Sequence, residues 1–383
     1  MDWTFLVKDK DSLHVTTDSR KVTPGCIFVA LKGEHFDGND FVDQARKDGA
    51  AYIISGENAL CELQDLARAW RRELGLPVLG ITGTNGKTTT KELCAAVLST
   101  KYNLYYTRGN LNNQLGVPLT LLSITRAHEM AIVEMGASHP GDIKELVEIA
   151  EPDYGLITNV GKAHLLGFGS FEGVMRTKAE LYDFLRAHGG FCFRNTDNPY
   201  LAQMAGDLQT VPYTTGTMPE GTHLVGGYNA ENVSAALCVG AYFGVSEETA
   251  LAAVRAYIPS NNRSQFMQTE HNTVVVDAYN ANPTSMQAAI NAFKGNCYIL
   301  GAMRELGDYS HLEHQNIVNM LLERKAEIVL LVGEEYKETT APYPVFDNVD
   351  ELAEHLRQQP LQDCHILLKG SRSNQLEKVI PLL

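Results

Sequence analysis

The stretch Gly80-Ile-Thr-Gly-Thr-Asn-Gly-Lys-Thr-Thr89 decides how the rest of this chain is interpreted. A compact apolar run at residues 78–81 leads into it, and residues 89–98 after it have helical character. A strand, a glycine-rich turn and a helix in that order are the context that a phosphate-binding loop requires. Backbone N–H groups of such a loop close around phosphate oxygens, Lys87 can reach the terminal phosphates, and Thr88 offers a hydroxyl to Mg²⁺. The predicted nucleotide-binding residues of this loop are Gly83, Thr84, Asn85, Gly86, Lys87, Thr88 and Thr89.

The spacing of the glycines departs from the common P-loop pattern. That pattern places a glycine five residues before Gly86, where this chain has Ile81, and the nearer glycine is Gly83. A tight turn that opens a helix would account for the two glycines alone. It would not account for Lys87-Thr88-Thr89 directly after them, so we favour phosphate binding.

Composition sets broad limits on what the chain can be. Its 383 residues predict two or three domains at roughly 150 residues each. A formal net charge of −14 argues against a general nucleic-acid binder, because phosphate backbones need a basic surface. Seven scattered cysteines without a C-x-x-C pair predict reduced thiols rather than disulfides or a zinc site. The charged first ten residues do not resemble a signal peptide, and no apolar run reaches the ~18 residues that span a bilayer. We therefore expect a cytoplasmic enzyme without a membrane span.

Apolar runs that alternate with helical stretches predict an α/β fold with parallel sheets. The pattern breaks around residues 256–262, where a fresh β/α series begins. We expect three domains. They are a small N-terminal α/β domain (residues 1–76), a central domain whose P-loop-type, mostly parallel sheet carries helices on both faces (77–258), and a C-terminal Rossmann-like domain (259–383). The expected strands are residues 26–31, 51–54, 78–81, 130–133, 155–158, 190–193, 273–277, 297–300, 327–332 and 365–368.

Three polar side chains beyond the loop are candidates for a metal and phosphate site. Glu134 follows the apolar run 130–133, at the end of a strand where α/β proteins bind ligands. His164 follows the next expected strand, and Lys178 lies in a helical stretch. Each has a structural alternative: a charge at a helix N-terminus for the glutamate, a hydrogen-bonding role for the histidine, and a solvated position for the lysine. Asn229 could likewise serve a turn or a helix cap, and Asp277, at a strand end, could accept hydrogen bonds from ribose hydroxyls.

Residues 82–89 resemble the form that the phosphate loop takes in the Mur ligases and the related folylpolyglutamate synthetases. The resemblance continues along the chain. Asp18-Ser-Arg20 with residues 24–33 and 36–41 is similar to the UDP-binding first domain of the Mur ligases that add the third residue and the dipeptide. Asn110-Leu-Asn-Asn-Gln-Leu-Gly-Val-Pro118 and Asp277-Ala-Tyr-Asn-Ala-Asn-Pro-Thr-Ser285 resemble the branch that adds the dipeptide. The Asp-Asn-Pro-Arg tetrapeptide of the diaminopimelate-adding branch is absent from this sequence. Residues 300–307 and 368–372 are similar to the third domain of the family.

The resemblance implies an ATP-dependent ligase that joins D-alanyl-D-alanine to UDP-N-acetylmuramoyl-tripeptide through an acyl phosphate, in the synthesis of peptidoglycan precursors. Its cofactors would be ATP and Mg²⁺. Thr88, Glu134 and His164 would hold the metal, with Lys178 carbamylated, because a carbamate can approach a metal–phosphate site whereas an ammonium cannot. The residues expected to act in catalysis are Lys87, His164, Lys178 and Arg263.

The resemblance also assigns binding roles to residues outside the phosphate loop. Asn229 would recognise adenine, Asp277 would bind the nucleotide, and Arg263 would offset charge on the phosphates. Expected substrate contacts come from the three segments that distinguish the branches of the family, and the residues concerned are Ser19, Arg20, Asn112, Asn113, Tyr279, Asn280 and Asn282. We expect the protein to act as a monomer.

One departure from the family and three alternatives stay open. Only ten residues separate Tyr213 from Leu224, where family members usually carry some tens of residues more, so either the protein is trimmed here or a segment is missing from the sequence. The nearest alternative function is the ligase that adds the third residue. The other two are a P-loop kinase that phosphorylates a small molecule, and a non-catalytic nucleotide-binding regulator.

Overall fold

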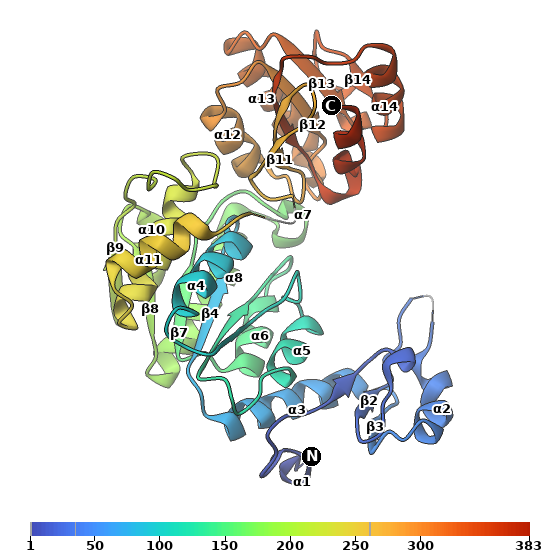
Figure 1. Cartoon of the computed structure of the whole chain (residues 1–383), viewed down its shortest axis with the longest axis vertical. Helices are drawn as coiled ribbons and strands as arrows, with labels where there is room; N and C mark the ends of the chain where they lie inside the picture. Colours follow the sequence, from blue (N-terminus) through green and yellow to red (C-terminus); the bar gives the residue numbers. More distant parts are fainter. Residues whose placement is uncertain (1, 35, 260–261) are drawn as a thin grey trace.

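The computed structural model describes residues 2–34, 36–259 and 262–383, which form three sheets that follow one another along the long axis of the molecule (Figure 1). The three sheets lie within residues 15–54, 78–213 and 265–369. Residues 260 and 261, inside the predicted break at 256–262, lie outside the described part. Among the described residues, no helix is both long enough and apolar enough to cross a bilayer.

The N-terminal sheet is small and is attached to the central domain through one long helix. Its strands are parallel and in chain order: β1 (Val15–Thr16), β2 (Ile27–Val29) and β3 (Tyr52–Ile54). The helices of this part are α1 (Thr4–Val7), α2 (Val42–Lys47) and α3 (Ala59–Leu74), with 3-10 turns at Ser19–Lys21 and Gly38–Phe41. Helix α3 buries Leu63, Leu66 and Trp70, and the Trp70 indole donates to the carbonyl of Ile124 at 2.9 Å. Because α3 packs against both the small sheet and two central helices, it fixes the first lobe to the second.

The central sheet has six strands, all parallel, in the order β5-β6-β4-β7-β8-β9. The strands are β4 (Val78–Thr82), β5 (Leu104–Tyr106), β6 (Met130–Glu134), β7 (Tyr154–Ile157), β8 (Phe191–Asn195) and β9 (Thr210–Tyr213). The helices are α4 (Lys87–Leu98), α5 (Gly116–Leu122), α6 (Asp142–Ala150), α7 (Leu165–Phe168), α8 (Phe171–His188), α9 (Pro199–Ala205), α10 (Asn229–Tyr242) and α11 (Glu247–Ala256). One face of the sheet packs on α5, α6 and α8 and the other on α4, α10 and α11, so the prediction of a parallel sheet covered on both faces is confirmed.

The central sheet ends at β9, just before the short connection that departs from the family pattern. Pro212 lies exposed in this strand and has no N–H to offer, which discourages a further strand from pairing there. No described strand lies between β9 and α10. The short connection therefore leads from the edge of the sheet directly to a helix that lines the functional cavity described below.

The C-terminal sheet also has six strands, in the order β10-β11-β15-β12-β13-β14, and only β10 is antiparallel to its neighbour. Its strands are β10 (Gln265–Gln268), β11 (Thr273–Asp277), β12 (Cys297–Gly301), β13 (Ile328–Val332), β14 (Val345–Phe346) and β15 (His365–Lys369). The helices are α12 (Pro283–Ala292), α13 (Ser310–Glu323) and α14 (Val349–Gln358), with 3-10 turns at Gly307–Tyr309, Glu334–Tyr336, Arg372–Asn374 and Leu376–Leu382. Helices α12 and α13 cover one face and α14 the other, so the Rossmann-like prediction is confirmed.

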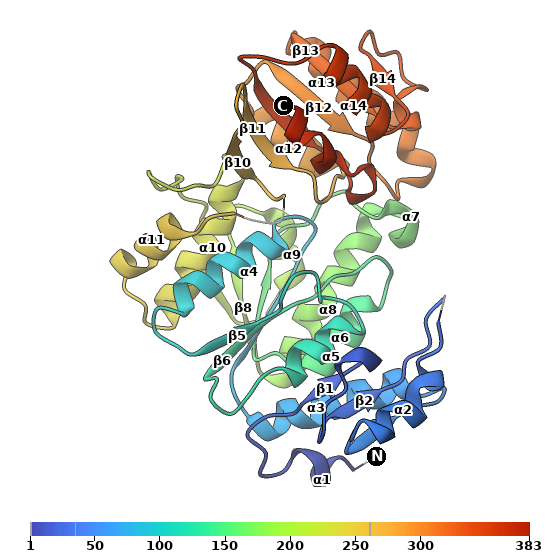
Figure 2. The same ribbon diagram turned by 45° about the vertical axis from the view of Figure 1, so that its right-hand side comes forward.

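The carboxyl ends of the two large sheets meet at one place (Figure 2). The phosphate loop follows β4 and Glu134 ends β6, whereas Asp277 and Lys369 end β11 and β15 of the other sheet. All of these line one cavity. Ligand sites of parallel α/β sheets lie beyond the carboxyl ends of the strands, so this junction is where a site is expected.

Candidate active site

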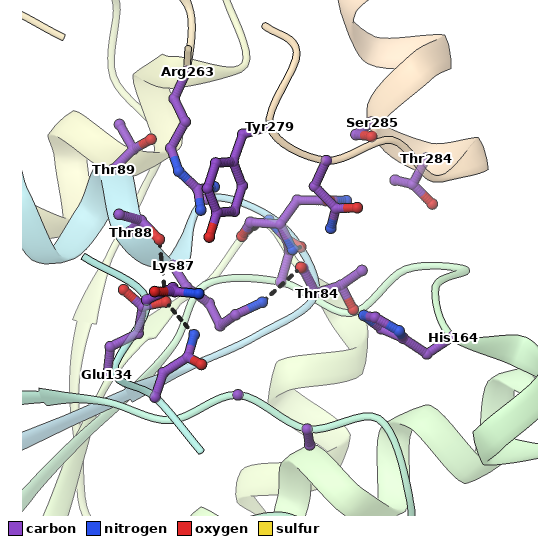
Figure 3. A pocket seen from close by; sticks show the side chains of 18 of the residues that line it. Thr84, Lys87, Thr88, Thr89, Glu134, His164, Arg263, Tyr279, Thr284 and Ser285 are labelled. Atoms are coloured by element: carbon purple, nitrogen blue, oxygen red, sulfur yellow. Dashed lines mark hydrogen bonds between the residues drawn. The ribbon is translucent and has the colours of Figure 1, made fainter. Parts of the chain in front are cut away.

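A cavity of about 800 Å³ lies between the central and C-terminal domains, and the sequence-predicted residues gather in it (Figure 3). The predicted residues that line it are Thr84, Asn85, Gly86, Lys87, Thr88, Thr89, Asn112, Asn113, Glu134, His164, Asn229, Arg263, Asp277, Tyr279 and Asn280. Five predicted residues are not among its lining: Gly83, Lys178, Asn282, Ser19 and Arg20.

The phosphate loop is built so tightly that two of its positions admit only glycine. Gly83 has φ +141°, and a Cβ there would lie 2.0 Å from the hydroxyl of Thr158. Gly86 has φ +78°, and a Cβ there would lie 2.4 Å from the Asn232 side-chain oxygen. These close approaches explain the glycine spacing: the loop packs against the segment after β7 and the start of α10, and it needs glycine where it touches each of them.

Lys87 folds back over the loop that precedes it. Its Nζ donates to the carbonyl oxygens of Gly83 at 2.8 Å and Thr84 at 3.0 Å. Burial lowers the pKa of Lys87 to about 8, with Arg263 adding to the fall and Glu134 opposing it. A bound phosphate would offer this ammonium a stronger acceptor than the two carbonyls, because hydrogen bonds to ionised groups are stronger.

Glu134 and Thr88 form a pair suited to a divalent cation. The Thr88 hydroxyl donates to Glu134 Oε1 at 3.1 Å, and the Asn112 amide donates to the same oxygen at 2.8 Å. Glu134 is 1% exposed, and its Oε2 has no hydrogen-bond partner. A buried carboxylate beside a threonine hydroxyl matches the oxygen ligands that Mg²⁺ prefers. In the described part of the chain, no three His, Cys, Asp or Glu side chains form a metal-binding group.

His164 is held across the domain junction. It adopts a left-handed backbone (φ 49°) before α7, and its Nδ1 pairs with a carboxylate oxygen of Glu305 from the C-terminal domain. Burial lowers the pKa of His164, and the Glu305 carboxylate partly opposes that fall. The metal role of His164 stays a prediction, and in this structure the side chain forms the hydrogen bond that the structural alternative expects.

Lys178 lies inside helix α8 rather than on its solvated face. It is 2% exposed, and its Nζ lies 5.5 Å from the centroid of the Phe168 ring. No residue in the described ranges forms a hydrogen bond or ion pair with its amine. Burial, followed by the charge of Lys87, holds the pKa of Lys178 well below its ordinary value, against Asp142 and Glu180. The solvated-lysine alternative is therefore wrong.

The asparagines at the start of α10 are satisfied within the protein. The Asn229 amide donates to the carbonyl of Val225 at 2.7 Å and accepts from Asn232 at 2.9 Å. Asn232 in turn accepts from the Thr90 hydroxyl of helix α4 at 3.0 Å. The chain of bonds ties the end of the short connection to the phosphate-loop helix, and Asn229 still lines the cavity.

Arg263 reaches the cavity from the C-terminal side. Its guanidinium stacks over the Tyr279 ring, 3.7 Å from the ring centroid. Figure 3 shows the two side chains together, extending toward Lys87 and Thr88. A stacked guanidinium is held in place while its N–H donors stay available for phosphate oxygens.

Asp277 has a partner that the sequence analysis did not single out. Its Oδ2 accepts from Lys369 Nζ at 2.6 Å, and Lys369 is 1% exposed. The same ammonium donates to the carbonyl of Asn280 at 3.2 Å, which fixes the turn after β11. The position of Lys369 at the end of a strand was the sequence signal that could have found it. The same rule would have found Asn159, which follows β7 and lines the cavity. The oxygens of Asn159 accept the N–H groups of Thr84 and Asn85.

Asn282 lies against the phosphate loop instead of in the cavity. Its Nδ2 donates to Asn85 Oδ1 at 2.8 Å, and its Oδ1 caps the start of α12. The resemblance assigned Asn282 to the incoming substrate, but here its side chain bridges two domains. Asn113 also has a structural bond, because its Oδ1 accepts the N–H of Gly116 at the start of α5, yet it lines the cavity.

Ser19 and Arg20 lie in the N-terminal lobe, outside the cavity. They belong to a 3-10 turn, where the Arg20 guanidinium pairs with Asp18 at 2.9 Å and is 87% exposed. The structure does not bring these two residues together with the phosphate loop, and their substrate role stays a prediction.

Comparison with known proteins identifies the family. The Mur ligase family catalytic domain matches residues 13–96, the Mur ligase middle domain residues 81–221, and the Mur ligase glutamate ligase domain residues 262–372. The UDP-N-acetylmuramoyl-tripeptide–D-alanyl-D-alanine ligase of Bacillus subtilis is 34% identical over 96% of this chain and 92% of that protein. The corresponding ligase of Escherichia coli is 33% identical over 96% and 93%.

A solved structure agrees with these relatives. The MurF ligase from Thermotoga maritima, crystallised in complex with ADP, superposes with a TM-score of 0.86 at 28% identity, over 98% of each chain. The alignment with the Bacillus subtilis protein extends over 421 positions, although the chain itself has 383 residues, so the relatives carry segments that this chain lacks. The sequence predicts the main gap after Tyr213. This chain belongs to the Mur ligase family.

Proposed function

We propose that this protein joins D-alanyl-D-alanine to UDP-N-acetylmuramoyl-tripeptide at the expense of ATP. One observation carries the proposal: two relatives named for this reaction are 34% and 33% identical to this chain over 96% of its length. The cavity supports it, because a phosphate loop and an arginine from another domain line the same space. The ADP bound to the Thermotoga maritima protein supports the nucleotide as the ligand of that loop.

The nucleotide phosphates would lie on the loop at residues 83–89. Lys87 would exchange its bonds to Gly83 and Thr84 for phosphate oxygens, and Arg263 would approach the same phosphates from the Tyr279 side. These two cations act where negative charge gathers during phosphoryl transfer, so electrostatic stabilisation would outweigh acid–base work. The terminal carboxylate of the tripeptide takes the γ-phosphoryl group, and the dipeptide amine then displaces phosphate from the acyl phosphate to form the amide.

Thr88 and Glu134 are the residues that fit Mg²⁺, with His164 as a further ligand that the resemblance implies. When bound, the cation would offset charge on the phosphate oxygens. The chain contributes the Thr88 hydroxyl and the buried Glu134 carboxylate, already oriented by the Asn112 amide.

Lys178 is proposed to carry a carbamate. A neutral amine attacks carbon dioxide, forms an N–C bond and releases one proton, which leaves a carboxylate at the end of the side chain. Burial favours the neutral amine that this reaction needs, and the nearby start of α6 offers a positive helix end to the product. A ¹³C resonance of a carbamate after exposure to labelled carbon dioxide, present in the protein and absent from Lys178→Ala, tests the assignment.

The other substrates would approach from the two flanking domains. Ser19, Arg20, Asn112 and Asn113 are proposed to contact the UDP-linked peptide. Tyr279 and Asn280 are proposed to meet the dipeptide, and Asn229 and Asp277 the nucleoside. Because the sites for nucleotide and dipeptide lie on different domains, closure of the C-terminal domain is expected to accompany turnover.

A substrate panel with the purified protein tests the function. With ATP and Mg²⁺, UDP-N-acetylmuramoyl-tripeptide and D-alanyl-D-alanine should release phosphate and yield one new amide, detected by mass. Release with diaminopimelate or lysine and the shorter UDP-dipeptide substrate, but none with D-alanyl-D-alanine, would identify the third-residue ligase instead. A product that retains a phosphoester would indicate a kinase, and nucleotide binding without turnover a regulator.

Two further assignments complete the proposal. The nucleotide-linked substrate and the free cysteines of the described residues support action in the cytoplasm. We propose a monomer, because one chain supplies both faces of the cavity; sedimentation at assay concentration tests this. The same substrate panel, run with tripeptides that differ in their third residue, identifies which third residue the enzyme accepts.

A further inference from the structure

A second lysine of helix α4 lies directly behind the candidate metal site. Lys91 follows Lys87 by four residues, so it lies on the same face of the helix one turn further in. It is 0% exposed. Its Nζ donates to the carbonyl of Thr107 at 2.7 Å and lies 3.1 Å from a Glu92 carboxylate oxygen. A lysine buried this completely is rare in proteins unless its charge is paired.

Lys91 also lies close to Glu134, and the two carboxylate oxygens of Glu134 have different surroundings. Oε1 accepts from Thr88 and Asn112, on the cavity side. Oε2 has no hydrogen bond, and the Lys91 ammonium lies 3.6 Å from it. Opposite charges at this separation attract strongly where water is excluded. The carboxylate is therefore held with one oxygen toward the cavity and the other toward Lys91.

Thr107, the residue directly after β5, holds both Glu134 and Lys91 in place. Its hydroxyl accepts the backbone N–H of Glu134 at 3.0 Å, while its carbonyl accepts from Lys91. One residue thus fixes both the backbone that carries the carboxylate and the cation that orients it. Neither end of Glu134 is free to turn.

We propose that Lys91 is a positioning residue that makes Glu134 bind its cation through Oε1 alone. This inference rests on the proposed function, which places the cation at Thr88 and Glu134. Mg²⁺ demands near-octahedral geometry with one oxygen per ligand, whereas Ca²⁺ readily accepts both oxygens of a carboxylate. Because Lys91 attracts Oε2 and keeps it from the cation, the site should bind Mg²⁺ in preference to Ca²⁺.

The test compares metal-dependent nucleotide binding in Lys91→Met with that in the unaltered protein. A fluorescent ADP analogue is titrated with Mg²⁺ and with Ca²⁺, and the ratio of the two half-saturating concentrations is measured. Loss of one charge contact predicts a shift of this ratio by about tenfold toward Ca²⁺. Lys101→Met is the matched control, because Lys101 also donates to backbone carbonyls but lies beyond the C-terminal end of the helix, and it should leave the ratio unchanged.

An unchanged ratio in Lys91→Met would overturn the proposal and leave Lys91 a structural residue. If neither Mg²⁺ nor Ca²⁺ changed the binding of the analogue to the unaltered protein, the proposed metal site itself would be wrong, which is a separate outcome. If Lys91→Met does not fold, the double variant Lys91→Met/Glu134→Gln decides. If the double variant has the same thermal midpoint as the single variant Glu134→Gln, the lysine acts on this carboxylate. A lower midpoint would show that it acts only on Thr107, and the proposal would fail.

Discussion

The two walls of the cavity are built in different ways. The phosphate loop is contained within the central domain, where glycines at positions 83 and 86 let it pack on its own neighbours and Lys87 closes it without outside help. The opposite wall comes from the C-terminal domain, and it is placed by a few bonds that cross the junction. Those bonds include Asn282 to Asn85, Thr284 to the N–H of Lys162, Glu313 to the Lys162 ammonium, and Glu305 to His164.

Because the two walls are built in different ways, we expect one to serve nucleotide binding and the other to serve turnover. A wall contained in one domain can bind nucleotide whatever the position of the other domain. A wall that depends on crossing bonds contributes only when the domains are together, so its loss should lower turnover more than nucleotide affinity. The following predictions test this separation, beginning with the largest expected effect.

Removal of the loop lysine should have the largest effect. Lys87→Met deletes the ammonium that offsets phosphate charge, and we expect kcat/KM to fall by about 10³-fold, at the upper end of what one electrostatic contact supplies. Nucleotide affinity should fall as well, because Lys87 belongs to the binding wall. Lys101→Met, just beyond the C-terminal end of α4, should retain activity in the same assay of phosphate release.

Removal of the stacked arginine should come next and should affect turnover selectively. Arg263→Ala takes away a cation that acts from the other domain, and we expect kcat to fall by about 10²-fold. ADP affinity, measured by calorimetry, should change far less. Arg255→Ala removes an exposed arginine that donates to the carbonyl of Glu220, and it serves as the control. Equal losses of affinity and kcat in Arg263→Ala would contradict the separation of the two walls.

The asparagine bridge should show a smaller, coupled effect. Asn282→Ser keeps an N-cap for α12 but is too short to reach Asn85, so kcat should fall by about tenfold if the bridge is worth about 1.4 kcal/mol in turnover. Asn85→Ala should give a similar loss, and the double variant should be no worse than either single variant. Additive losses would show that the two side chains act independently.

The smallest expected effect is the uptake of a proton when the nucleotide binds. Lys87 has a pKa of about 8 in the nucleotide-free protein, and bound phosphate raises it again by pairing with the ammonium. Nucleotide binding near pH 9 should therefore take up most of one proton, and binding near pH 6.5 almost none. Calorimetry in buffers of different ionisation enthalpy measures the uptake, and Lys87→Met should abolish it.

The same pKa has a consequence for stability. The unfolded chain holds this proton up to the ordinary value of 10.5, whereas the folded chain releases it near 8. The unfolded state therefore binds more protons between these values, and the contribution of Lys87 to stability rises with pH across that window. Thermal midpoints of the nucleotide-free protein, compared between unaltered chain and Lys87→Met from pH 8 to 10, measure this contribution.

Much of the fold followed from local patterns. The apolar runs of the buried parallel strands were long enough to be recognised, and β4, β6, β7 and β8 lie within one or two residues of their predicted positions. The short strands β1, β5, β9, β10 and β14 were missed. They have only two to four residues each and lie at or next to sheet edges, so their sequences carry no extended apolar run.

The site was predictable in part for the same reason. Residues at the end of a strand, such as Glu134, reach the carboxyl edge of the sheet wherever the chain goes next. The partners of these residues were not predictable. Lys369 pairs with Asp277 from 92 residues away, and Glu305 reaches His164 from 141 residues away.

The sequence alone was enough to predict the phosphate loop, the longer buried strands and several of the polar residues that end them, because glycine placement, apolar runs and strand ends act over a few residues. The tertiary structure alone decided which of those residues meet. It buried Lys178 and Lys91, turned Asn282 onto the phosphate loop and left Arg20 exposed on a separate lobe. Burial and pairing depend on how sheets and domains pack, and that packing joins residues whose separation along the chain carries no signal.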